Sequence, residues 1–145
     1  MKKLYLLFII LGSLLKAQSK IETPFFIFSC NCSLVEESYN TNNKSYNYSY
    51  QDNDGKSISM ISVKNPTIGD KGFLNSIKLS GTFNYRNANF RGVNAVIAEI
   101  YQGGQYGIHI GFFFNKNVYS IILASPDENR TAKMFTEFSQ TFNYK

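Results

Sequence analysis

Two neighbouring stretches in the first half of the chain alternate between apolar and polar residues. Every second residue over 46–50 is a tyrosine, and residues 57–64 carry apolar side chains at alternating positions. This two-residue period is typical of β-strands. The intervening residues 52–55 read Asp-Asn-Asp-Gly, which favours a turn. We therefore predict a β-hairpin whose first strand has an aromatic face formed by Tyr46, Tyr48 and Tyr50.

The spacing of the apolar residues changes after this hairpin. Pro66 ends the second strand because proline cannot donate a hydrogen bond to a neighbouring strand. Over residues 69–79 the apolar positions fall on one side of a helix of about three turns. Gly81 is suited to end this helix. The residues on its buried side are predicted to be Phe73, Leu74 and Ile77.

Three strand-like runs follow in succession, over residues 93–101, 106–114 and 118–123. The first two alternate, and the third is rich in β-branched and aromatic residues. Their connections, Gly103-Gly104 and residues 115–117, are short enough for antiparallel hairpins. The second half of the sheet is therefore predicted to be a three-stranded meander.

The signals for a helix start follow the meander directly. Ser125 can cap the helix, Pro126 suits its first position, and Glu128 lies three residues after the cap. An apolar stripe on this helix can pack against the sheet. The stripe consists of Phe135, Phe138 and Phe142, with Thr131 at its upper end. The predicted fold class is α+β: an antiparallel β-sheet with this C-terminal helix and the shorter helix packed on it, in an α/β sandwich.

The first seventeen residues have the layout of a secretory signal peptide. Two lysines form a positively charged start, residues 4–15 are mostly apolar, and the small residue Ala17 suits a cleavage site. The apolar run is shorter than the roughly 20 residues that cross a bilayer. We predict cleavage between Ala17 and Gln18. The mature chain, residues 18–145, is expected to form a single α+β domain that is periplasmic or secreted from a bacterial-type cell.

Charge gives little indication of a partner. The net charge of +5 includes three lysines of the N-terminal segment, so the mature chain has twelve basic and ten acidic side chains, a net charge of +2. The basic residues are scattered singly rather than clustered, as phosphate binding would require. We expect no nucleic-acid partner and no stable membrane span in the mature chain. A protein or small-molecule partner is compatible with the sequence, which does not specify it.

Three packing patterns lie in the C-terminal half. Residues 91–95 (Arg-Gly-Val-Asn-Ala) open a strand, residues 117–121 (Asn-Val-Tyr-Ser-Ile) follow a hairpin, and the phenylalanine-striped helix closes the chain. With these patterns, residues 90–145 resemble the Mog1/PsbP-like proteins, which are small α+β domains with a central antiparallel sheet and helices on its sides. The resemblance implies this fold but no functional residue, because such proteins include both photosystem-associated lumenal subunits and a nuclear-import factor.

Cys30 and Cys32 are candidates for chemistry in an exported chain, where thiols tend to be oxidised. In a straight strand their Cβ atoms would lie about 6–7 Å apart, beyond the roughly 3.5–4.5 Å of a disulfide, so a bridge requires a bend or bulge. Without a bridge they would be small buried side chains. The other hypotheses are a thiolate pair for a soft metal such as Cu(I), and disulfide exchange or pairing with another chain. Zinc is disfavoured because His109 is the only histidine.

His109 lies between two glycines in the apolar run from Gly107 to Gly111. The glycines could open a ligand pocket beside this titratable group, or they could let a helix or strand approach closely. Glu99, in the preceding strand, is a carboxylate that could act with His109 if the fold brings them together. The tyrosine stripe over 46–50 could stack on a sugar or peptide, or it could cover the half-buried face of an edge strand.

The sequence contains no established catalytic motif. It has no serine-nucleophile elbow, no His-Glu-x-x-His, no phosphate-binding glycine loop and no paired-carboxylate motif. We therefore expect an exported or periplasmic binding or accessory protein that catalyses no reaction, with ligand and cofactor unspecified. The alternatives are a small exported enzyme that uses His109 with a carboxylate, and a metal- or thiol-handling protein built on Cys30 and Cys32.

Overall fold

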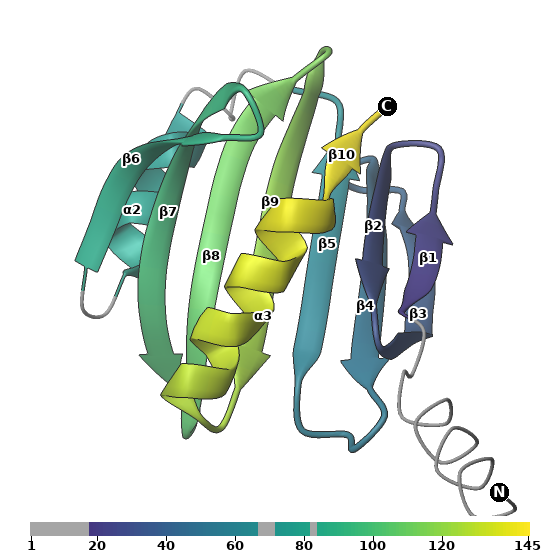
Figure 1. The fold of residues 1–145 in the computed structure, drawn as a ribbon. Coiled ribbons are helices and arrows are strands. Elements are labelled where there is room, and N and C mark those ends of the chain that lie inside the picture. The colour runs from purple at the N-terminus through teal and green to yellow at the C-terminus, as the bar shows by residue number, and fades with distance from the viewer. Residues whose placement is uncertain (1–17, 67–71, 82–83) are drawn as a thin grey trace, which may run out of the picture.

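The computed structural model describes residues 18–66, 72–81 and 84–145, and Figure 1 shows how their helices and strands are arranged. The predicted signal peptide lies outside the described residues, as do the first residues of the helix predicted from residue 69. Within the described part of the chain, no helix is long and apolar enough to cross a membrane.

The larger of two sheets is antiparallel and has seven strands in the described residues, in the order β3-β4-β5-β9-β8-β7-β6. Its strands are β3 (Cys32–Asn40), β4 (Ser45–Asp52), β5 (Ile58–Lys64), β6 (Asn84–Phe90), β7 (Val93–Gln102), β8 (Gln105–Phe114) and β9 (Asn117–Ser125). The predicted hairpin is β4–β5 and the predicted meander is β7–β8–β9. Gly103 and Gly104 both have positive φ in the β7–β8 turn, which is a backbone conformation that glycine adopts without strain.

The remaining elements cover the two faces of this sheet (Figure 1). Helix α3 (Glu128–Thr141) crosses one face, which we call the inner face. Beside it lies a smaller antiparallel sheet of β1 (Ser19–Glu22), β2 (Phe26–Cys30) and β10 (Asn143–Tyr144), in the order β1-β2-β10. Helix α2 (Phe73–Ser80) packs on the opposite, outer face against β7 and β8. The fold is therefore α+β, as predicted, with helices on both sides of an antiparallel sheet.

The main core lies between the inner face of the large sheet and the layer formed by α3 and the small sheet. The alternation in β5 places Ile61 and Val63 in this core, with about 1% and 0% of their surfaces exposed. Phenylalanines from β2 and α3 fill the other side. Burial of each such side chain stabilises the fold by roughly 1.5–3 kcal/mol, so the alternation largely determines which face of each strand turns inward.

The start of α3 differs from the prediction. The capping residue is Asp127, whose carboxylate accepts a hydrogen bond from the backbone N–H of Arg130 at 2.7 Å. Ser125 is instead buried at the end of β9, where its hydroxyl accepts from the Asp127 N–H and contacts the Thr131 hydroxyl. The serine was a wrong choice of cap because β9 continues through residue 125, which leaves the helix to begin two residues later.

Five strands were not predicted from the sequence: the three of the small sheet and the two edge strands of the large sheet. The two edge strands of the large sheet, β3 and β6, consist mostly of exposed side chains and therefore lack an apolar alternation. The short strands β1 and β10 are held by pairing with β2. Strand β3 also has a bulge between Leu34 and Glu36, which interrupts its two-residue period.

Candidate functional site

A cleft of about 800 Å³ lies between α3, β2 and the β4–β5 hairpin. The buried rings of Phe28, Tyr50 and Phe138 contribute to its lining. Polar and charged side chains from both α3 and the hairpin complete it. Burial raises the pKa of Tyr50 to about 12, so its phenol is neutral and the cleft keeps an uncharged aromatic floor.

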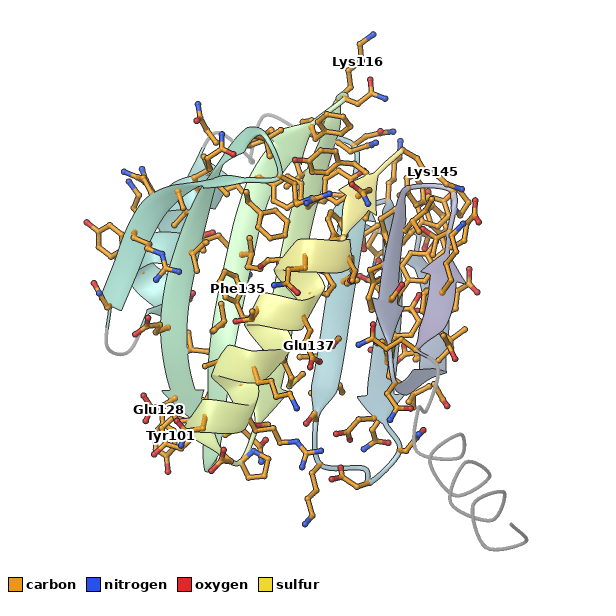
Figure 2. All side chains as sticks on the ribbon, viewed as in Figure 1. Tyr101, Lys116, Glu128, Phe135, Glu137 and Lys145 are labelled. Atoms are coloured by element: carbon orange, nitrogen blue, oxygen red, sulfur yellow. A yellow bond between two sulfur atoms is a disulfide. The ribbon has the colours of Figure 1, made fainter. Side chains whose placement is uncertain are left out.

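Helix α3 contributes charge to one side of the cleft. Lys133 and Glu137 both line it and lie one helical turn apart, with 3.8 Å between Nζ and Oε1. Figure 2 shows Glu137 on the side of α3 that faces β5, and Phe135 on the other side, above β8. The stripe predicted for this helix is therefore divided: Phe138 borders the cleft, and Phe135 packs away from it beside Arg86.

An ionic cluster closes the end of the cleft near the β4–β5 turn. Arg130 donates through Nε to the Ser57 hydroxyl at 2.6 Å, and through its terminal nitrogen to Asp52 and to both oxygens of Asp54. The hydrogen bond from Arg130 holds the pKa of Asp54 at about 2. The cluster ties the first turn of α3 to the hairpin across more than seventy residues of sequence.

The two cysteines form a disulfide on the wall of the cleft. Cys30 ends β2 in the small sheet, Cys32 begins β3 in the large sheet, and Asn31 forms a bend between them. The bend brings their Cα atoms to 5.2 Å, within the usual range for disulfides. The sequence predicted that a bridge would need such a bend. While the sulfurs are bonded to each other they are not thiolates, so the Cu(I) hypothesis would first require reduction.

The tyrosine stripe lies on the inner face of β4 and packs against β2. Tyr48 and Tyr50 are buried, with ring centroids 5.3 Å from Phe26 and 5.2 Å from Phe28 respectively. Tyr46 is 42% exposed, and its ring is tilted against that of Phe25, with 4.9 Å between the centroids. Of the three rings, Tyr46 is therefore the one that retains substantial contact with solvent, and Tyr50 reaches the cleft from the core.

His109 lies on the outer face, in a chain of hydrogen bonds between two serines. The Ser80 hydroxyl donates to the Ile77 carbonyl, so it accepts from Nδ1–H of the imidazole at 3.2 Å. This assigns the proton to Nδ1 and leaves Nε2 to accept from the Ser120 hydroxyl at 2.8 Å. Burial lowers the pKa of His109 to about 4, so the imidazole is neutral at pH 7.

The glycines that flank His109 allow close packing around it. A Cβ added to Gly111 would lie 2.7 Å from Ile77 Cγ1, and one added to Gly107 would lie 2.6 Å from Ile100 Cγ1. Gly111 therefore lets α2 approach the sheet, and Gly107 makes room for the Ile100 side chain of β7. The two glycines therefore allow close packing and do not open a ligand pocket at these positions.

The surroundings of His109 offer little help to a reaction. Ser120 lies in the middle of β9 and is paired on one side with β5 and on the other with β8, so the adjacent backbone amides belong to the sheet. Stabilisation of an oxyanion would need free donors there. Glu99 is opposite Ile108 and therefore faces the inner side, where it lies 3.8 Å from Arg86. The fold does not bring Glu99 to His109.

Sequence reasoning missed the ionic cluster because its members are far apart in the chain. Residues 52–55 were interpreted as turn residues, and Arg130 gave no signal in the predicted helix. Repeated acidic residues in a turn could have suggested a basic partner, but not which one. Among the described residues, no group of three or more His, Cys, Asp or Glu side chains is arranged to hold a metal ion.

This arrangement, with a twisted antiparallel sheet between helices on its two faces, is a PsbP-like fold. The solution structure of cyanobacterial PsbP (CyanoP) from Synechocystis sp. PCC 6803 is similar, with a TM-score of 0.64 and 9% sequence identity. The match covers 92% of this chain and 96% of that one, so the likeness extends well beyond residues 90–145. No protein-family model and no curated protein sequence matches the chain. At this identity the likeness shows the fold alone.

Proposed function

We propose that this protein is an exported, non-catalytic binding or accessory protein whose ligand site is the cleft between α3, β2 and the β4–β5 hairpin. The observation that carries the proposal is the combination of an aromatic floor with charged groups of both signs in one cavity of about 800 Å³. Ligand sites are typically concave, with apolar walls and a few polar groups that fix orientation. A ligand with both an apolar part and hydrogen-bonding groups fits this lining.

Export to the periplasm or beyond is the second part of the proposal. It is supported by the signal-peptide pattern of residues 1–17 and by the Cys30–Cys32 disulfide, since disulfides persist mainly in oxidising compartments. Cleavage after Ala17 would make Gln18, which lines the cleft, the first residue of the mature chain. The intact mass of the protein from the exported fraction tests this part, and a mass that includes residues 1–17 would contradict it.

Binding can be tested on ¹⁵N-labelled residues 18–145, titrated with a panel of small aromatic amides and aromatic carboxylates. We expect the amide resonances that move to cluster on β2, on the β4–β5 hairpin and along the cleft side of α3. Ser59→Phe should abolish these shifts, because Ser59 lines the cleft and a ring there would occupy it.

Ser62→Phe is the matched control on the same strand. Ser62 is directly opposite Ser120, so it lies on the outer face, away from the cleft. This variant should bind the fragments as the unchanged protein does, and circular dichroism should show both variants folded. Shifts that cluster around His109 and Ser120, or shifts that survive Ser59→Phe, would place binding elsewhere.

A small exported enzyme is the second candidate, favoured by the 2.8 Å between Ser120 Oγ and His109 Nε2, which is the spacing of a nucleophile and its base. It is the weaker candidate because neither a carboxylate nor free backbone donors lie beside this pair in the described residues. The two functions differ in one requirement: an enzyme needs His109 for turnover, whereas cleft binding should tolerate His109→Gln.

A further inference from the structure

The Cys30–Cys32 disulfide closes a very small loop. A single residue, Asn31, separates the two cysteines. A disulfide stabilises a fold mainly by restricting the unfolded chain, and this effect becomes smaller as the closed loop becomes shorter. With one residue in the loop, the restriction is near its minimum. Stabilisation of the fold is therefore a weak explanation for this bond.

The strands on either side of the disulfide are held in place without it. Cys30 is paired with Ser19 in the small sheet, and Cys32 is paired with Asp52 in the large sheet. The bend itself is held by a hydrogen bond of 2.8 Å from the side-chain amide of Asn53 to the side-chain oxygen of Asn31. Opening the sulfur–sulfur bond would leave these contacts in place, so the two thiols should stay near each other in the reduced protein.

The disulfide also borders the cleft, so a molecule bound there would lie beside it. Both cysteines line the cleft, and each is only partly buried against the core. Asn31 between them is exposed. Access to a sulfur atom is one of the factors that set the rate at which a thiolate attacks a disulfide.

We propose that Cys30–Cys32 is a thiol–disulfide exchange site that accepts two electrons from a dithiol in a peptide segment entering the cleft. This activity goes beyond ligand binding and does not depend on it, because a cleft could bind a ligand without thiols and leave the disulfide intact. Exchange requires a disulfide that can open and close while the protein stays folded. The strand pairing of the two cysteines and the Asn53–Asn31 hydrogen bond would hold the thiols near each other while the bond is open.

The exchange is balanced in two steps. A substrate thiolate attacks one sulfur of the pair, so that a mixed disulfide forms, the Cys30–Cys32 bond breaks and the released thiolate takes a proton from water. The second substrate thiolate then attacks the substrate sulfur of the mixed disulfide and releases the other cysteine. The substrate is oxidised to a disulfide and the protein is reduced to a dithiol. Further turnover would need reoxidation by a disulfide of low molecular weight, such as oxidised glutathione.

The test uses the mature chain, purified without reductant, and a reduced synthetic peptide that carries two cysteines. After mixing, acid quenching and alkylation, mass spectrometry should show one peptide disulfide formed for each protein molecule that gains two alkylated cysteines. A peptide with one cysteine replaced by serine should instead accumulate a mixed disulfide, and digestion would identify the attacked cysteine. Far-UV circular dichroism of the reduced protein should match that of the oxidised protein.

The control is the double variant Cys30→Ala, Cys32→Ala, in which peptide oxidation should fall to the rate in buffer alone. If this variant does not fold, wild-type protein reduced and alkylated under native conditions serves instead. The proposal is overturned if the disulfide stays intact while the peptide stays reduced, or if reduction unfolds the protein. It is also overturned if the peptide is oxidised equally fast by the double variant.

Discussion

At the scale of single residues, His109 is the clearest case of an environment that sets the state of a side chain. The imidazole is mostly withdrawn from water, and its two nitrogens contact neutral hydroxyls, Ser80 and Ser120, rather than a carboxylate. Burial without a negative partner favours the neutral form, which is why the pKa of His109 falls to about 4. Stability should therefore depend on the protonation of this residue.

The direction of that dependence follows from proton uptake. In the unfolded chain His109 has the usual pKa of about 6.5, so between pH 6.5 and 4 the unfolded state binds a proton that the folded state does not. The contribution to stability is complete above about pH 6.5, is lost as the pH falls, and stops decreasing below about pH 4. We expect a loss of roughly 3 kcal/mol across this window.

Urea unfolding of the wild type and His109→Gln at pH 7.5, 5.5 and 4.5 measures this loss. Glutamine can keep hydrogen bonds to serine but does not titrate, so carboxylates should account for all remaining pH dependence in the variant. The difference between the two proteins isolates His109. Parallel stability curves for both proteins would contradict the assigned environment.

At the scale of elements, α3 depends on contacts at its first turn. Asp127 caps the helix, and Arg130 in the same turn joins it to the β4–β5 hairpin through Ser57 and two aspartates. The pattern Ser-Pro-Asp-Glu predicted a helix here and was right about its presence. The residue that caps the helix depended on where β9 ended, which is set by pairing with β8 and β5.

We expect Asp127→Ala to destabilise the protein by about 1 kcal/mol, because the backbone N–H of Arg130 would lose its acceptor. Asp127→Asn is the matched control, since the asparagine side-chain oxygen can cap the helix equally well. Urea unfolding at pH 7 measures both. If Asp127→Ala has no effect, or if Asp127→Asn is as damaging, the cap is not made by the side-chain oxygen.

At the scale of the whole molecule, one aromatic cluster joins helix α3, the small sheet and the large sheet. Phe142, just after α3, is fully buried and contacts Phe26 of the small sheet and Phe112 of the large sheet, with centroids 5.8 Å and 6.3 Å away. Its neighbours also include Phe90 and Phe138. The small sheet therefore depends on the same core as the helix, and the cleft beside it depends on both.

Phe142→Ala should cost about 3–5 kcal/mol, because it leaves a cavity where α3 and the two sheets meet. The matched control is Phe113→Ala on the outer face, where the ring is 41% exposed and less apolar contact is lost. Denaturant unfolding, followed by far-UV circular dichroism, gives both values. Equal losses for the two variants would mean that Phe142 does not hold the layers together.

Periodicity in the sequence was enough to predict the elements that bury one face and expose the other. The β4–β5 hairpin, the β7–β9 meander and both helices could be predicted because burial of one face leaves a period of two or 3.6 residues in the chain. The need for a bend between Cys30 and Cys32 also followed from local geometry, since strand spacing alone separates their Cβ atoms too far.

Features that arise from contacts between distant segments became visible only in the folded protein. Edge strands such as β3 are specified by pairing with a neighbour, so polar side chains are compatible with them. The same holds for the site: Arg130 meets Asp54 76 residues away in sequence, and Glu99 is separated from His109 by the thickness of the sheet. Contacts between distant segments leave no pattern in a single sequence, because each segment satisfies its own local preferences independently of the partner it will meet.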